Sequence, residues 1–282
     1  MYIIVWGSNR LKKDKKKPTK YQDFDKYFYY TASVQSAEND AAFMAKTYEE
    51  IRGKKAQIMR EDFCGTFALS CEWVKLDPSH ISVGVDLDPE PLAYGKANYL
   101  PKLTPNQAKR LSLHEKDVLR AELPPADLVC ALNFSYFIFK ERKVLGAYFK
   151  HVLESLRPDG ALLLDCFGGS RCYEANEEET EHEDNNFSYF WDQENYDPIT
   201  NHAMFHIHFR RHGEAKRKKV FSYDWRLWSI PELRDLLLEA GFSSVKVYWE
   251  GTDTEGEGDG EFTEAKVGEE CESWIAYIVG LR

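Results

Sequence analysis

The stretch "REDFCGTFALS" (Arg60–Ser70) decides how the rest of this chain is interpreted. It has the pattern of a buried strand that ends in a tight turn and leads into a helix, where α/β proteins often bind a nucleotide-like ligand. Such turns usually contain several glycines, because the backbone must approach the ligand closely. Here Gly65 is the one glycine of the turn, and Phe63 and Phe67 stand where further glycines are expected. The stretch therefore predicts a ligand-binding turn with an unusual loop.

Strand and helix patterns alternate on both sides of this turn. The segments "ISVGVD" (Ile81–Asp86), "ADLVCALN" (Ala126–Asn133) and "ALLLDCF" (Ala161–Phe167) are apolar runs typical of strands buried in a parallel sheet. Helical patterns lie between them, and another, "SIPELRDLLLEAGF" (Ser229–Phe242), precedes two closing strand patterns. This alternation predicts a doubly wound, Rossmann-like α/β sheet. The last two strands are joined without a helix, which predicts an antiparallel final strand.

The alternation is interrupted between residues 168 and 228. Residues 168–185 are rich in acids and are expected to form a loop, and three aromatic segments with the pattern of antiparallel strands follow. Residues 1–35 have no clear period and are interpreted as an N-terminal extension. The sequence thus predicts a core of residues 36–167 and 229–282, with an antiparallel β insertion at 168–228 after the fifth strand.

Composition and charge argue against several classes of protein. No apolar run approaches the roughly 18 residues needed to cross a bilayer, so no membrane partner is expected. The net charge of -10 argues against nucleic acid as the default partner. Two basic runs, 10–20 and 216–219, are interpreted as solvated segments, with a patch for RNA or another polyanion as the alternative. The 6 cysteines form no CxxC pair and several lie in apolar strand patterns, which favours buried thiols and a cytoplasmic location.

A polar residue stands at the predicted carboxyl end of each of four strands. These residues are Glu61, Asp86, Asp117 and Asn133. Ligands of open α/β sheets bind beyond these strand ends, so polar groups gathered at one edge are more than a core requires. Asp86 follows the glycine turn by about twenty residues, the spacing at which a carboxylate reaches ribose hydroxyls. This edge is therefore the candidate ligand site.

The ordered pattern resembles class I S-adenosylmethionine-dependent methyltransferases. Their first turn often reads acid-x-G-C-G-T-G, and residues 61–67 match it at the acid and at "CGT". The segment "VGVDLDPEPLAYGKAN" (Val83–Asn98) resembles the second strand and helix of the family, and "HEKDVL" (His114–Leu119) resembles its adenine segment. Further matches cover the fourth and fifth strands and the final helix and strand. The resemblance extends over residues 56–167 and 225–282, and it implies a seven-stranded mixed sheet with S-adenosyl-L-methionine as cofactor.

The resemblance also implies a set of cofactor contacts. Asp86 takes the ribose-binding position, Asp117 faces the exocyclic amine of adenine, and the backbone of Val118 faces the ring edge. The full set of cofactor-binding residues is Glu61, Phe63, Cys64, Gly65, Thr66, Asp86, Leu87, Asp117, Val118 and Asn133. Phe63 and Phe67 replace two family glycines, so their side chains must point away, into the sheet–helix interface or over the cofactor. Because S-adenosylmethionine has no pyrophosphate, one close backbone approach at Gly65 is expected to suffice.

Methyl transfer is an in-line displacement that depends on positioning and on exclusion of water, and no metal is expected. A nitrogen or oxygen nucleophile can need a general base, and the catalytic candidates are Tyr136, Tyr223 and Arg226. His206 and His208 alternate on one predicted strand and so share a face. A hydrogen-bonded pair is favoured there over a metal site, because no third ligand is evident.

The insertion is expected to select the substrate. Its aromatic residues alternate along the strand patterns, and they either line a cavity suited to a cationic or amine substrate or form a small core of the insertion itself. These residues are Phe187, Tyr189, Trp191, Phe221, Tyr223 and Trp225. The sequence thus predicts a methyltransferase that acts on nitrogen or oxygen of a small molecule. The alternatives are a methyltransferase of protein or RNA, a non-catalytic binding module, and a nicotinamide-dependent oxidoreductase, which should have a fuller GxGxxG.

Overall fold

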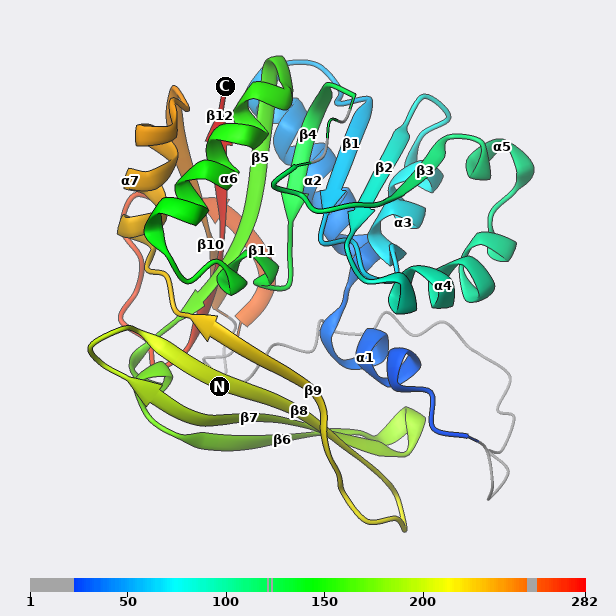
Figure 1. The fold of residues 1–282 in the computed structure, drawn as a ribbon, viewed down its shortest axis with the longest axis vertical. Helices are drawn as coiled ribbons and strands as arrows, with labels where there is room; N and C mark the ends of the chain where they lie inside the picture. Colours follow the sequence, from blue (N-terminus) through cyan, green and yellow to red (C-terminus); the bar gives the residue numbers. More distant parts are fainter. Residues whose placement is uncertain (1–22, 121, 123, 253–257) are drawn as a thin grey trace.

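Two β-sheets form the framework, a large one flanked by helices and a small one beyond the carboxyl ends of its parallel strands (Figure 1). The computed structural model describes residues 23–120, 122, 124–252 and 258–282. The basic run at residues 10–20 lies outside these described residues. The large sheet has the order β11-β10-β12-β5-β4-β1-β2-β3. Its strands are β1 (Ile58–Asp62), β2 (Ile81–Asp86), β3 (Leu111–Glu115), β4 (Ala126–Ala131), β5 (Leu156–Gly168), β10 (Ser244–Thr252), β11 (Gly258–Glu264) and β12 (Trp274–Leu281).

Pairing in the large sheet is parallel from β3 through β2, β1 and β4 to β5. β12 pairs antiparallel with β5, with Tyr277 opposite Asp165, and β10 pairs antiparallel with β12. The doubly wound mixed sheet and its antiparallel final strand are therefore confirmed. The predicted number of seven strands is wrong, because β11 adds an eighth strand at the edge beside β10. Phe262 of β11 contacts Tyr277 with 4.6 Å between ring centroids, a tertiary contact that the Gly- and Glu-rich local composition does not reveal.

Helices cover both faces of the large sheet. α2 and α3 pack on one face, and α6 and α7 pack on the other. The helices are α1 (Lys26–Val34), α2 (Ala37–Arg52), α3 (Ala68–Leu76), α4 (Pro89–Asn98), α5 (Pro105–Ala108), α6 (Arg142–Ser155) and α7 (Ile230–Ala240), with 3₁₀ turns at Leu100–Lys102, Ser135–Ile138, Ser170–Tyr173 and Glu183–Asn185. α7 has the expected signals, a capping box between Ser229 and Glu232 and a left-handed Gly241 at its end. Among the described residues, no helix combines the length and apolar character that crossing a bilayer requires.

The small sheet is antiparallel and has one strand more than predicted. Its strands, in spatial order, are β6 (Asn176–His182), β7 (Phe187–Asp197), β8 (His202–Arg211) and β9 (Arg217–Arg226). β6 forms from the acid-rich segment that was expected to be a loop. Its exposed glutamates pair with cations, Glu177 with Lys216 at 2.6 Å and Glu181 with His212 at 3.0 Å. Lys216 and His212 lie in the turn between β8 and β9, so contacts with that turn accompany the formation of this acid-rich edge strand.

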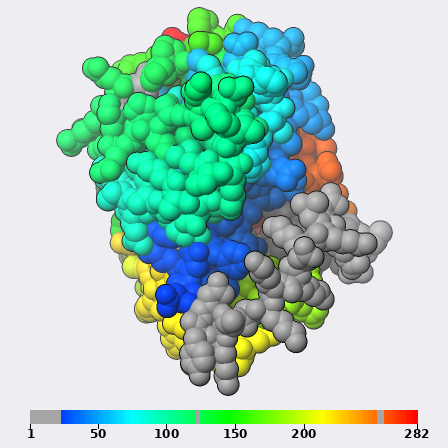
Figure 2. Space-filling model, turned by 90° about the vertical axis from the view of Figure 1, so that its right-hand side faces the viewer, coloured from blue at the N-terminus to red at the C-terminus, as the bar shows by residue number. Residues whose placement is uncertain are grey.

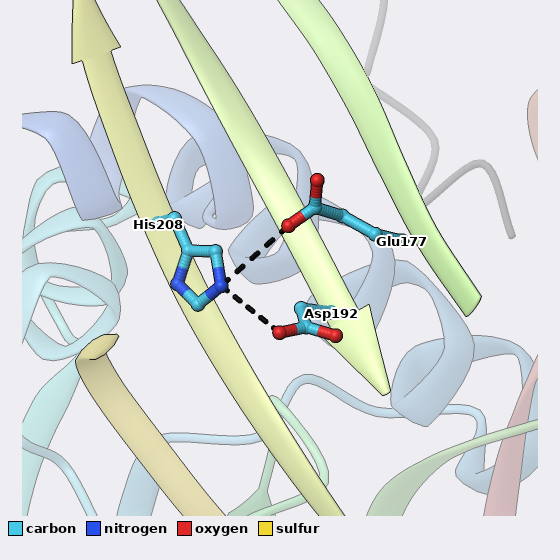
Figure 3. Close-up of side chains that lie close together, drawn as sticks. All are labelled: Glu177, Asp192 and His208. Atoms are coloured by element: carbon cyan, nitrogen blue, oxygen red, sulfur yellow. Dashed lines mark hydrogen bonds and ion pairs between the residues drawn. The ribbon is translucent and has the colours of Figure 1, made fainter. Parts of the chain in front are cut away.

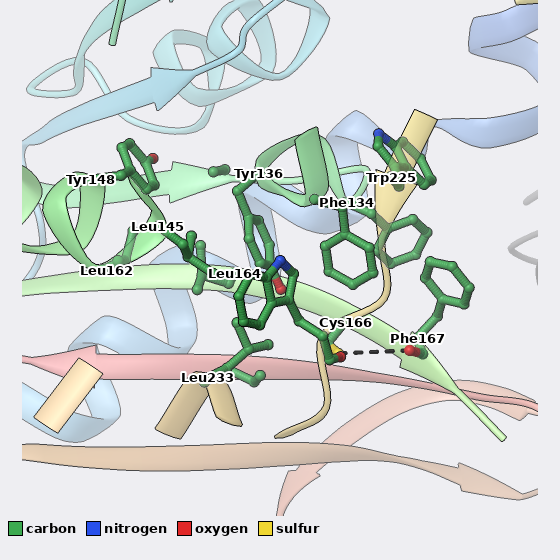
Figure 4. Close-up of a cluster of buried hydrophobic side chains, with 14 of the residues drawn as sticks. Phe134, Tyr136, Leu145, Tyr148, Leu162, Leu164, Cys166, Phe167, Trp225 and Leu233 are labelled. Carbon is green, nitrogen blue, oxygen red and sulfur yellow. Dashed lines mark hydrogen bonds between the residues drawn. The ribbon is translucent and has the colours of Figure 1, made fainter. Parts of the chain in front are cut away.

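The inner face of the small sheet joins the core of the large sheet. The alternating aromatic residues of β7 and β9 share this face, as expected from the sequence. The rings of Trp225 and Phe134 lie 6.3 Å apart between centroids, and those of Phe205 and Phe167 lie 5.9 Å apart. Side chains from the two sheets thus form one buried cluster (Figure 4). This shared packing fixes the insertion over the ends of the parallel strands.

Helix α1 connects the two sheets, although it lies in the segment interpreted as an extension. Tyr29 contacts Phe187 of β7 edge to face, with 4.8 Å between ring centroids. Tyr94 of α4 donates a hydrogen bond of 2.8 Å to Asp25, which caps α1. In Figure 2 the helix is the dark blue band between the large sheet's helices and the yellow strands of the small sheet. Its aromatic residues contact partners on different sides, which is why the sequence shows no helical period.

The central strand β1 contains three consecutive buried charges, Arg60, Glu61 and Asp62. On one face, Arg60 donates to both carboxylate oxygens of Asp62 at 2.8 and 3.1 Å, and Tyr148 donates to the same carboxylate at 2.9 Å. On the other face, Glu61 accepts hydrogen bonds from the backbone N–H and the hydroxyl of Ser70 at 2.9 and 2.5 Å. Burial raises the pKa of Glu61 to about 8. Arg60 and Asp62 thus compensate each other, and burial of Glu61 favours its neutral form.

Replacing Arg60 with methionine is expected to lower the free energy of unfolding by about 3–5 kcal/mol, because Asp62 would keep a buried charge without its cation. Denaturant titration of R60M and R60M/D62N measures this effect. The double variant should regain part of the loss, since a neutral amide oxygen still accepts from Tyr148. A loss below about 1 kcal/mol in R60M would show that the ion pair does not support β1.

Neutralising Glu61 is expected to change how stability depends on pH. The folded-state pKa of about 8 exceeds the usual 4.5, so the contribution of this carboxyl group is full below pH 4.5 and is lost as pH rises through 8. The amide of E61Q does not titrate. The unfolding free energy of E61Q relative to the natural protein should therefore rise with pH, by up to about 1.4 kcal/mol per pH unit. Parallel curves for the two proteins between pH 5 and 9, obtained by urea titration, would contradict this assignment.

Candidate functional site

The turn between β1 and α3 keeps a glycine-like backbone despite its two phenylalanines. Phe63, Gly65 and Phe67 have φ values of 60°, 51° and 51°, all in the left-handed region. This region strains residues that have a side chain, and such strain is concentrated at functional sites. The family-like turn is therefore present in the backbone, although the sequence pattern is incomplete.

Both phenylalanine rings point away from the turn, as expected. Phe67 is fully buried and fills the space left by Gly95 of α4, where an added Cβ would collide with its ring. Phe63 packs against Phe139 and Tyr148, with ring centroids 5.7 and 5.8 Å away. Around Gly65 the space is open, since a Cβ built there would meet no atom within 4 Å. The backbone at Gly65 is thus free to meet a ligand.

Asp86 joins the turn to the end of β2. One carboxylate oxygen accepts from the Gly65 N–H at 2.6 Å, and the other accepts from the Asp88 N–H at 2.8 Å. Burial raises the pKa of this carboxyl group, which nevertheless stays partly exposed. The next residue, Leu87, is 68% exposed, although an apolar side chain of this size is usually covered. The end of β2 therefore presents a carboxylate beside an uncovered apolar surface.

The other predicted residues of the turn face the interior. Glu61 binds Ser70 at the start of α3, as described above. Cys64 and Thr66 are 2% and 5% exposed, and the backbone N–H and carbonyl of Cys64 are both hydrogen-bonded within the protein. These residues shape the turn from within.

The predicted adenine segment follows β3 in a turn. β3 ends at Glu115, two residues before the expected end at Asp117. Asp117 accepts from the Leu119 N–H at 2.9 Å and pairs with Arg120 at 3.5 Å, and it remains partly exposed. Val118 is buried, with 6% of its surface exposed. These two residues lie at the same sheet edge as Asp86, because β2 and β3 are parallel neighbours.

The end of β4 forms a second strained turn around a carboxylate that the sequence analysis missed. Asn133 and Phe134 both have a φ of 56°, and their backbone N–H groups donate to Asp165 at 2.6 and 2.9 Å. Asp165 lies on β5 and is 8% exposed. An acid inside the apolar run "ALLLDCF" was the signal that could have identified it.

The three predicted catalytic residues do not come together in one site. Tyr136 is fully buried and donates to the backbone carbonyl of Asp165 at 2.7 Å, which disfavours a role as general base. Arg226 binds Glu232 at 3.0 Å and so supports the start of α7. Tyr223 faces tyrosines of α1 and β7, and burial raises its pKa well above the usual value. Tyr223 lies on the inner face of the small sheet, where it is hydrogen-bonded to Tyr30 and stacks on Trp225 with 4.5 Å between ring centroids.

A cavity of about 50 Å³ lies beside Asn133 at the ends of β4 and β5. We call it the acidic cavity, because its lining includes Asp40, Asp165 and Glu250 together with Phe134, Phe262 and Tyr277. Asp40 and Glu250 also escaped the sequence analysis. They lie on α2 and β10, far apart in the chain, so no local pattern connects them.

His208 belongs to a group with metal-ligand chemistry, formed with Glu177 and Asp192 (Figure 3). Its Nδ1 accepts from the Lys219 N–H at 2.9 Å, and its Nε2 lies 3.0 Å from Asp192. In a neutral ring the proton then resides on Nε2, which leaves no lone pair there for a metal ion. His206 is also hydrogen-bonded at both ring nitrogens. Both histidines are thus held by hydrogen bonds at their two ring nitrogens.

Solved structures with the same fold are methyltransferases. The CcbJ methyltransferase of Streptomyces caelestis aligns with a TM-score of 0.64 and 15% identity over 88% of this chain and 97% of its own. An S-adenosylmethionine-dependent methyltransferase of Clostridium acetobutylicum has a TM-score of 0.63 and 18% identity over 90% and 96% of the two chains. CalS10, an amino pentose methyltransferase of Micromonospora echinaspora, has a TM-score of 0.61 and 16% identity over 92% and 99%.

No family model and no curated protein matches the chain in sequence. At these low identities the structural likeness concerns the fold. The order of the parallel strands, the antiparallel β12 and the turn at Gly65 all agree with it. The chain has the Rossmann-like fold of class I S-adenosylmethionine-dependent methyltransferases.

Proposed function

We propose that this chain is an S-adenosylmethionine-dependent methyltransferase that acts on a small molecule. The observation that carries the proposal is the end of β2, where the Gly65 N–H fixes the partly exposed Asp86 and Leu87 lies uncovered beside it. A carboxylate in this position can accept from two ribose hydroxyls, and an exposed leucine can cover a purine face. Similar structures include an amino pentose methyltransferase and the sugar N-methyltransferase KedS8, which supports a small acceptor.

The residues present fit the cofactor. Asp86 would hold the ribose and Leu87 the adenine, with Asp117 and Val118 at the ring edge. The open backbone at Gly65 and the strained turn at Asn133 would contact the methionine portion of the cofactor. When bound, S-adenosylmethionine would supply an electrophilic methyl group. The acceptor would form a bond to the methyl carbon while the carbon–sulfur bond breaks, and the electron pair of the broken bond would stay on sulfur. The turn has one glycine, whereas a pyrophosphate-containing nicotinamide cofactor is typically bound by a fuller GxGxxG.

The rest of the chain would enclose the reacting groups. In this proposal, residues 168–228 form the insertion that selects the acceptor, and α1 closes the gap between the two sheets. Exclusion of water keeps the acceptor oriented and prevents side reactions. The cysteines at 64, 71, 130, 166 and 172 are buried free thiols, and they support a cytoplasmic location.

Adding the cofactor to the purified protein is expected to raise its thermal unfolding midpoint. S-adenosylmethionine and S-adenosylhomocysteine, each at about 100 times its dissociation constant, should add roughly 2.7 kcal/mol of stability. NAD and NADH should leave the midpoint unchanged. Stabilisation by NAD alone, or by none of the four compounds, would contradict the proposed function.

Replacing Leu87 with alanine is expected to weaken cofactor binding without changing the stability of the protein. The side chain is 68% exposed, so its removal costs the fold little. Loss of apolar contact with adenine should cost on the order of 1 kcal/mol, roughly a fivefold rise in dissociation constant by calorimetry. I81A is the matched control, because Ile81 is 40% exposed at the opposite end of the same strand. Equal affinity for L87A and I81A would exclude Leu87 from the site.

A further inference from the structure

The acidic cavity lies where an acceptor would meet the proposed donor site. Asn133 belongs both to its lining and to the candidate cofactor site. Asp165 enters from β5 and Tyr277 from β12, directly opposite each other in the sheet. Glu250 enters from β10 and Asp40 from α2. The three carboxylates are close enough that each helps to raise the pKa of the Tyr277 hydroxyl.

These carboxylates have hydrogen-bond donors but no cation. Tyr277 donates to Asp40 at 2.7 Å, Gly260 donates to Glu250 at 3.2 Å, and Asp165 receives the two backbone N–H groups of the β4 turn. No lysine, arginine or histidine among the described residues forms an ion pair with any of the three. Asp165 and Glu250 are each 8% exposed. Buried charges are normally paired, and the described residues supply no cation for these carboxylates.

The walls of the cavity suit an organic cation better than a bare metal ion. Phe134, Phe262 and Tyr277 contribute aromatic rings, and Phe43 stacks on Tyr277 with 4.5 Å between centroids. Aromatic faces attract ammonium groups, whereas a hard metal ion prefers a shell of oxygen atoms. The volume of about 50 Å³ has room for an amino group and its carbon.

Buried donors also lie on the inner face of the small sheet, which adjoins the cavity through Phe134. The hydroxyl of Tyr189 and the indole N–H groups of Trp191 and Trp225 are buried and have no hydrogen-bond partner within the described ranges. These side chains are between 2% and 3% exposed. Trp225 contacts Phe134, which lines the cavity. Buried donors of this kind call for oxygen atoms that the described chain does not supply.

We propose that the acidic cavity is the acceptor site and that it binds the amino group of a small polar amine as an ammonium ion, between Asp165 and Glu250. The inference rests on the proposed function, and it selects nitrogen over oxygen as the methyl acceptor. The bound amine must lose a proton before its lone pair can react. Burial raises the pKa of Asp165 and of Glu250 to about 7, so either carboxylate can take up that proton near neutral pH.

Thermal unfolding with methylammonium chloride tests the cavity, with potassium chloride at equal concentration as the reference. Methylammonium should raise the midpoint by about 2–4 °C above the reference in the natural protein. The increment should vanish in D40N/E250Q, where each amide keeps an oxygen for its single donor. Asp165 is left intact, because both of its oxygens accept backbone N–H groups. D224N is the matched control, since Asp224 pairs with Lys140 outside the cavity lining.

The same measurement separates this inference from the proposed function. S-adenosylhomocysteine should stabilise the natural protein and D40N/E250Q equally, and its effect should add to that of methylammonium. The acceptor site is overturned if methylammonium does not raise the midpoint above the potassium chloride reference. It is also overturned if the rise in midpoint persists in both the single variant E250Q and the double variant D40N/E250Q. Competition between methylammonium and S-adenosylhomocysteine overturns it as well, because the cavity would then hold the donor. Absence of stabilisation by S-adenosylhomocysteine contradicts the proposed function, while the methylammonium comparison still reports on the cavity.

Discussion

The hydrogen bond from the Gly65 N–H to the Asp86 carboxylate holds together the edge on which the proposed site depends. It ties a turn with three left-handed residues to the end of the neighbouring strand. Two of those residues are phenylalanines, whose strain is of order 1–3 kcal/mol each. Burial of Phe67 in the space left by Gly95 offsets part of this cost. The turn thus keeps the backbone of a glycine-rich loop while its side chains serve the core.

The small sheet and α1 pack next to this edge, and α1 contacts both β7 and α4. Aromatic packing between Trp225, Phe134 and Phe167 anchors the small sheet over the ends of β4 and β5. Within the part of the chain that the structure describes, donors on the same face have no hydrogen-bond partner, and carboxylates of the nearby cavity form no ion pair. Arg60 and Asp62 of the central strand, in contrast, compensate each other by direct hydrogen bonds. That pair supports the fold, because neither charge is left without a partner.

The sequence by itself determined the elements whose signals are local. Alternating strands and helices, the capping box of α7 and the antiparallel pairing of β12 all follow from patterns within a few residues. The placement of Asp86 beside the Gly65 turn also follows, because the carboxyl ends of parallel strands meet at one edge. These features depend on backbone geometry and on hydrophobic periodicity. Both can be recognised from the sequence without knowing the tertiary structure.

Tertiary structure alone decided the rest, because the interactions concerned join distant segments. β6 and β11 have loop-like compositions, and as strands they make long-range contacts, Glu177 of β6 with Lys216 and Phe262 of β11 with Tyr277. Tyr136 looked available at the end of β4 but is covered completely by the core. The acidic cavity collects residues from α2, β5 and β10, and no sequence spacing brings these together. Burial removes their carboxyl groups from water and raises their pKa, an effect of tertiary packing that no local sequence pattern contains.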